Sequence, residues 1–137
     1  MSAPAWIDAQ LDRLHDPMLM VGRVLIAAIF IYDATLLVRF PADNVAYMQQ
    51  FGLPGILLYP TAIFQFFGGL LIVFGLWLRP AALAFAGFCL MTAIVFHHDF
   101  AQLTELIQFG KDVALSGGFL FIAATGPSAA RDPSRIA

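Results

Sequence analysis

Two adjacent charges interrupt the last apolar stretch of the sequence, which reads QFGKDVALSGG between positions 108 and 118. Lys111 and Asp112 stand side by side in a segment that is otherwise compatible with hydrocarbon. A charge left alone near the centre of a bilayer costs about 2.5 kcal/mol or more, so these side chains should face other helices and find partners. They can form a structural ion pair, or they can form a proton or ligand site.

Further polar residues interrupt or close the other apolar stretches. Asp33 stands late in the first, Gln65 lies inside the second, and two histidines end the third. At a rise of about 1.5 Å per helical residue, all of them fall in the outer half of the bilayer, as do the two charges of the last stretch. We therefore expect one ligand- or partner-binding cluster, with Asp33 paired to Lys111. The candidate residues are Asp33, Gln65, His97, His98, Lys111 and Asp112, with Arg23 set apart from them.

Each candidate also has a purely structural interpretation. The acids and Lys111 can simply hold the bundle together, and Gln65 can make a hydrogen bond between helices. His97 and His98 can mark a turn at the membrane boundary, and because neighbouring side chains on a helix point about 100° apart, we predict no metal site there. The sequence does not show which residue, if any, is catalytic.

The spacing of the last stretch places its polar residues on one face. Gln108, Lys111 or Asp112, and Ser116 follow the helical periodicity and should form a single stripe. Arg23 lies ten residues before Asp33, which is about 15 Å along a helix, so these two cannot pair directly. Arg23 should extend toward the membrane surface or meet a lipid headgroup or a partner protein.

The composition indicates that this protein lies in the lipid bilayer. Of its 137 residues, 61% are hydrophobic and 12% are charged, against about 25% charged in soluble domains. A net charge of -2 without a basic run gives no reason to expect nucleic acid as a partner. The single cysteine, Cys89, excludes an internal disulfide and a paired-cysteine redox motif.

The apolar stretches predict an all-α, polytopic membrane four-helix bundle. The expected spans are residues 18–38, 56–78, 81–96 and 108–125, which together form one domain over 18–126. Residues 1–17 should form an uncleaved interfacial amphipathic segment that ends at Pro17, and residues 127–137 a polar, disordered tail. More Lys and Arg flank the side that carries the termini than the other side, which predicts both termini in the cytoplasm.

Several short segments together resemble the DoxX family of small four-span bacterial and archaeal membrane proteins. They are GRVLIAAIF at 22–30, YMQQFGLP at 47–54, FQFFGGLLIVFGLWLRPAAL at 64–83, and QFGKDVALSGG at 108–118 followed by GPS at 126–128. The resemblance extends over about Val21 to Arg131. It assigns the matched polar positions of the family to Arg23, Gln65, His97, Lys111 and Asp112.

The chain departs from the family pattern in its charges. The family often has Glu where Gln65 stands, and often Lys where Leu37 stands, whereas Asp33 is not a usual family position and Asp112 replaces a common Asn. One charged pair is lost and other acids are gained, which indicates rewired pairing. An activity that needs the usual Glu is in doubt here.

The resemblance implies an accessory subunit of a quinone-linked redox or respiratory complex in the bacterial inner membrane. The expected partners are the lipid bilayer and either a larger membrane complex or further copies of the chain. We expect no covalent cofactor, and a quinone as the ligand if there is one. The aromatic residues of the second span, chiefly Phe64, Phe66, Phe67, Phe74 and Trp77, should face lipid or wall a quinone groove. The alternatives are a small oligomeric transporter-like or ligand-binding protein, or an assembly subunit without activity.

Overall fold

The computed structural model describes residues 5–126, and these residues are helical apart from short connections. The elements are α1 (Ala5–Arg39), α2 (Pro41–Gln50), a 3-10 turn η1 (Gly55–Leu57), α3 (Leu58–Phe74), α4 (Leu78–Phe96) and α5 (Leu103–Thr125). Four segments are long and apolar enough to cross a membrane: within α1, over η1 and α3, α4, and α5. The prediction of an all-α protein with four spans is confirmed.

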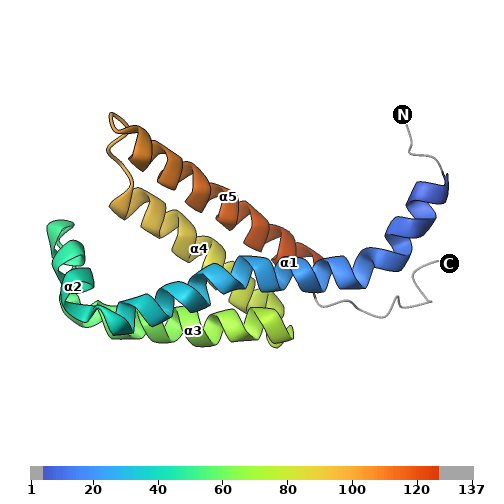
Figure 1. The fold of residues 1–137 in the computed structure, drawn as a ribbon, viewed down its shortest axis with the longest axis horizontal. Coiled ribbons are helices and arrows are strands. Elements are labelled where there is room, and N and C mark those ends of the chain that lie inside the picture. The colour runs from blue at the N-terminus through green and yellow to red at the C-terminus, as the bar shows by residue number, and fades with distance from the viewer. Residues whose placement is uncertain (1–4, 127–137) are drawn as a thin grey trace.

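The four spans form two pairs. Helix α1 packs along α3, and α4 packs along α5, whereas contacts between the pairs are fewer. In Figure 1 the pairs diverge toward the end that carries α2. We call this the loop end, since it also carries the α4–α5 loop at 97–102, and the opposite end, with the α3–α4 turn at 75–77, the terminal end. A buried cluster that includes Phe30, Ile72, Phe85 and Phe119 joins the pairs.

Helix α1 is longer than the sequence predicted. Its 35 residues span about 52 Å at 1.5 Å per residue, which exceeds a hydrocarbon core of about 30 Å. The expected break at Pro17 does not occur, because Pro17 lies inside the helix. The interfacial segment and the first span are one element, and its N-terminal part projects beyond the other helices (Figure 1). The expected tail at 127–137 lies outside the described residues.

Three other helix boundaries also differ from prediction. Helix α3 ends at Phe74, because Gly75 adopts a left-handed conformation with φ 72° and caps it. Helix α4 starts at Leu78 and includes Pro80, which fits its first turn because an N–H is not needed there. The last span begins at Leu103 rather than at residue 108.

Replacing Gly75 with alanine should destabilise the protein by about 1 kcal/mol, because a Cβ is strained at positive φ. The added methyl group would also lie 2.6 Å from Arg23 Nη1, although that side chain can move. Thermal unfolding in detergent measures the effect. The control is Gly87→Ala inside α4, where a Cβ meets nothing within 4 Å and should raise stability by up to about 1 kcal/mol. Equal effects of the two substitutions would contradict this explanation.

Candidate functional site

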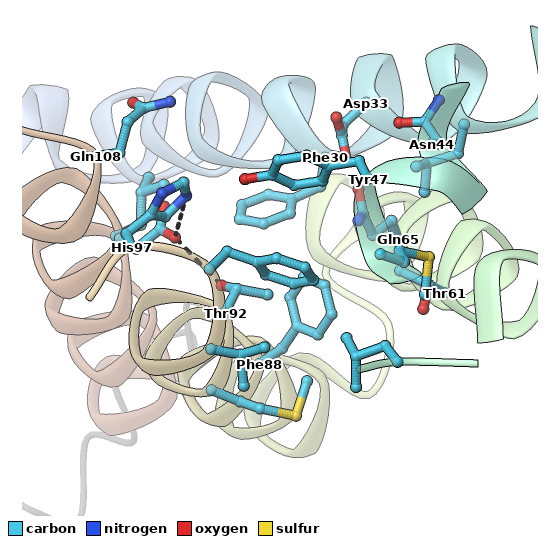
Figure 2. Close-up of a pocket in the computed structure, with 18 of the residues that line it drawn as sticks. Phe30, Asp33, Asn44, Tyr47, Thr61, Gln65, Phe88, Thr92, His97 and Gln108 are labelled. Atoms are coloured by element: carbon cyan, nitrogen blue, oxygen red, sulfur yellow. Dashed lines mark hydrogen bonds and ion pairs between the residues drawn. The ribbon is translucent and has the colours of Figure 1, made fainter. Parts of the chain in front are cut away.

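A cavity of about 460 Å³ lies between the two helix pairs at the loop end. Every α-helix contributes to its lining, and Figure 2 shows the side chains converging on it. The polar residues of the lining are Asp33, Asn44, Tyr47, Thr61, Gln65, Thr92, His97, Gln108, Lys111 and Asp112. The cavity thus brings together five of the seven residues that the sequence singled out, and leaves out Arg23 and His98.

One wall holds a connected set of charged and polar groups that we call the Asp112 network. Thr92 donates a hydrogen bond to Asp112 Oδ2 at 3.2 Å, and Lys111 Nζ lies 3.7 Å from Asp112 Oδ1. His97 Nε2 lies 4.0 Å from Asp112 Oδ2, and its Nδ1 lies 2.8 Å from Glu105 Oε2. The imidazole therefore sits between two carboxylates. When both ring nitrogens carry protons, each faces a negative charge.

The periodicity of α5 decides which charge belongs to the buried stripe. Asp112 and Ser116 are buried, and Gln108 is half-buried, so the stripe follows i, i+4, i+8. Ser116 anchors it by donating a hydrogen bond to the carbonyl of Ala86 at 3.0 Å. The side chain of Lys111 remains 41% exposed. Of the two charges that the sequence left open, Asp112 is the one that faces α4.

The expected ion pair between Asp33 and Lys111 is wrong. Within residues 5–126, Asp33 takes part in no ion pair, and Lys111 pairs with its neighbour Asp112. The physical reason is the divergence of the helix pairs at the loop end, which places the cavity between α1 and α5. Asp33 and Lys111 line this same cavity, and Asp33 is half-buried there.

Gln65 has an unsatisfied acceptor in the cavity wall. The residue is only 4% exposed, and no group in the described part of the chain donates a hydrogen bond to its Oε1. Leaving a buried amide group without a partner costs about 1–3 kcal/mol. The hydrogen bond between helices that the structural interpretation of Gln65 expects is not formed at this atom. A ligand in the cavity with a hydroxyl or N–H group would supply the missing donor.

Helix α2 lines the loop end of the cavity and contacts α4 through an aromatic pair. The ring of Tyr47 stacks on Phe96 at the end of α4, with centroids 5.5 Å apart and planes 16° apart. Burial, and secondarily the negative charge of Glu105, raises the pKa of the Tyr47 phenol. Tyr47 is therefore a neutral O–H donor at physiological pH. Sequence reasoning did not select Tyr47 or Glu105, although Tyr47 opens the YMQQFGLP motif.

The aromatic walls come from α1 and α4 rather than from α3. Phe30 and Phe88 line the cavity, and their rings lie edge to face at 6.4 Å. Of the aromatic residues expected to face lipid or to wall a groove, Phe74 and Trp77 face outward, with exposed fractions of 70% and 79%. Phe66 and Phe67 line a separate groove between α1 and α3.

Two candidates lie elsewhere. His98 is exposed, and its Nδ1 lies 3.1 Å from the carbonyl oxygen of Val95, as expected of a residue in a boundary turn. Arg23 lines a separate groove at the terminal end. Across residues 5–126, no three His, Cys, Asp or Glu side chains converge in a way that could hold a metal ion.

Comparison with known proteins identifies the family of this chain. The sequence profile of DoxX matches residues 18–98, which is more than half of the chain. The chain belongs to the DoxX family. Inner membrane protein YqjF of Escherichia coli K12 is 39% identical over 119 residues, which cover 87% of this chain and 92% of YqjF. Inner membrane protein YphA of the same strain is 31% identical, covering 82% of this chain and 85% of YphA.

No solved structure matches the chain significantly. The family assignment, the two inner-membrane relatives and the four spans together make this DoxX protein a multi-pass protein of the bacterial inner membrane. Of the five positions that the family resemblance singled out, the cavity contains Gln65, His97, Lys111 and Asp112.

Proposed function

We propose that this DoxX protein is an accessory subunit of a quinone-linked redox complex, and that its cavity holds the head group of a quinone or quinol. The observation that carries the proposal is the unpartnered Gln65 Oε1, which is buried in the wall of an amphipathic cavity. A reduced head group has two hydroxyl donors, and one of them would satisfy this acceptor. Asp33, which no ion pair engages within residues 5–126, is a second acceptor on the same side.

The cavity has the size and chemistry that such a ligand needs. Its volume of about 460 Å³ lies within the range of about 300–1,000 Å³ that is usual for small-molecule sites. Phe30 and Phe88 offer apolar faces to a flat ring. Tyr47 and Lys111 are donors that can bond to the carbonyl oxygens of the oxidised form. The polar groups therefore suit both redox states of the head group.

The role is that of a subunit because the chain lacks side chains that could carry electrons by themselves. The sequence has one cysteine, which excludes an iron–sulfur cluster of the usual kind within one chain. Its three histidines are His15 near the N-terminus and the adjacent His97 and His98, which do not form a pair of axial haem ligands. Electrons for a quinone in the cavity would have to come from a partner.

Replacing Gln65 with leucine should reduce the amount of co-purified quinone about tenfold, because one buried hydrogen bond of about 1.4 kcal/mol is lost. The measurement is gentle detergent extraction of the native protein, followed by mass spectrometry of all proteins, lipids and quinones in its peak. The matched control is Gln49→Leu on the exposed surface of α2, which should retain the wild-type amount.

Two outcomes would contradict the proposal. Equal quinone content in the wild type and in Gln65→Leu would exclude the cavity as the site. Purification as a homo-oligomer with neither a redox partner nor a quinone would favour the transporter-like or ligand-binding alternative.

A further inference from the structure

A second, separate groove lies at the terminal end of the bundle, between α1 and α5. It has a volume of about 350 Å³. We call it the terminal groove, and Gly22, Arg23, Ile26, Phe121, Ile122 and Gly126 are among the residues that line it. Apart from Arg23 and Thr125, its lining is apolar or glycine. The groove therefore combines a hydrocarbon-compatible channel with one guanidinium group.

Most N–H donors of Arg23 have no hydrogen-bond partner among the described residues. Its Nε donates to the carbonyl of Leu19 at 3.3 Å, and no acid pairs with it within residues 5–126. A guanidinium has five N–H donors in a planar fork, so four of them remain for other groups. The fork lies close to the left-handed Gly75, where an added Cβ would be 2.6 Å from Arg23 Nη1. A cation held in this way in a membrane protein calls for an anion.

A second arginine, from α4, lies beside a residue of the groove. Arg79 covers Gly126, a lining residue of the groove, since a Cβ added there would lie 2.7 Å from Arg79 Nε. Arg79 is exposed, and it too forms no ion pair inside the described part of the chain. Two guanidinium groups from different helices therefore lie in or beside one apolar groove, and neither has a matching carboxylate among the described residues.

We infer that the terminal groove binds an anionic phospholipid, with its phosphodiester on Arg23 and Arg79 and an acyl chain along Ile26 and Ile122. An arginine fork matches two phosphate oxygens at once. Basic pockets between membrane helices are a known type of site for anionic headgroups. The apolar channel selects a lipid over free phosphate, and the surplus of positive charge selects an anionic lipid over a zwitterionic one.

The inference is independent of the proposed quinone site, which lies at the opposite end of the bundle. A position for an acyl chain is already open at Gly22, because a Cβ added there meets nothing within 4 Å. Leucine at this position has an open Cβ position and would extend its side chain into the groove. The groove can thus be blocked sterically while both arginines stay in place.

The test uses Trp77, which directly precedes Leu78 of the groove, as a fluorescent probe. Replacing Trp6 with phenylalanine leaves Trp77 as the only tryptophan of the full-length chain. The protein is reconstituted in phosphatidylcholine vesicles with brominated phosphatidylglycerol or brominated phosphatidylcholine as quencher. We expect phosphatidylglycerol to bind about thirtyfold more strongly, which corresponds to about 2 kcal/mol, or about 1 kcal/mol for each of the two arginines near the surface.

Arg23→Gln should reduce this preference to about fivefold, because Arg79 remains, and Gly22→Leu should abolish it although the charge is unchanged. Arg39→Gln, at the loop end, is the matched control and should leave it intact, since it makes the same change in net charge. Equal quenching by the two lipids in the parent protein would overturn the inference. A preference that Arg23→Gln leaves at the value of the parent protein, or one that added inorganic phosphate abolishes, would overturn it as well.

Discussion

Replacing Asp112 with leucine should lower the stability of the folded protein in detergent by about 3 kcal/mol. The carboxylate is buried, and it accepts a hydrogen bond from Thr92 and faces Lys111 and His97. Removing it leaves positive and polar groups without their common partner, and breaking a buried pair costs about 3–5 kcal/mol. We expect the lower end of that range because the side chain of Lys111 is 41% exposed and can turn toward water.

Asp33 provides the comparison that separates structure from function. It lines the same cavity but takes part in no ion pair among residues 5–126. Asp33→Leu should therefore leave the free energy of unfolding unchanged or raise it slightly, because no partner is orphaned and an unpaired acid is removed. If the cavity binds a quinol, the same variant should nevertheless retain less of it. Stability is measured by unfolding with increasing denaturing detergent, and ligand content by mass spectrometry on the same preparations.

The Asp112 network fails as an explanation if both aspartate variants unfold at the same denaturant concentration. A stable Asp112→Leu variant would show that this acid contributes little to packing. Asp112→Asn refines the result, since it keeps the Thr92 interaction but removes the charge. The stability of Asp112→Asn should lie between that of the wild type and that of Asp112→Leu.

The spans could be predicted because lipid imposes a simple rule on sequence. Each span has to satisfy its own backbone hydrogen bonds internally and to expose apolar side chains to lipid. Length and hydropathy therefore suffice to find it. The ends of the helices could not be predicted as well. Pro17 was expected to begin a span but lies inside α1, since the preceding residues continue the same helix. Gly75 ended α3 earlier than Arg79 and Pro80 had indicated, because its left-handed conformation acts as the cap.

The membership of the site was predictable, but its pairing was not. Depth along a helix follows from residue number, so Asp33, Gln65, His97, Lys111 and Asp112 could all be assigned to one half of the bundle. Which of them touch depends on how far the helix pairs diverge, and that is a property of packing between distant segments. The contribution of α2 was missed for the same reason: Tyr47 lines the cavity next to Phe96 of α4, and this contact joins distant segments.

Phe85 joins the two helix pairs on the side of the cavity that faces the terminal end. Phe85→Ala should destabilise the protein by about 2 kcal/mol. The side chain is fully buried, and its ring lies 4.8 Å from Phe30, 4.7 Å from Phe64 and 4.9 Å from Phe119 between centroids. Phe→Ala costs about 3–5 kcal/mol in water-soluble cores, partly because the side chain leaves water on folding. That part is small in a membrane, where lipid is as apolar as the core, so mainly the packing loss remains.

The matched control for Phe85 is Phe67→Ala on α3, whose side chain is 60% exposed and should contribute little packing. We expect its free energy of unfolding to change by less than about 0.5 kcal/mol. Equal losses in the two variants would show that the aromatic cluster does not join the helix pairs. Because Phe30 belongs to the cluster and also lines the cavity, Phe85→Ala should loosen one wall of the site. Ligand retention should therefore fall together with stability in Phe85→Ala, whereas Gln65→Leu should lower retention alone.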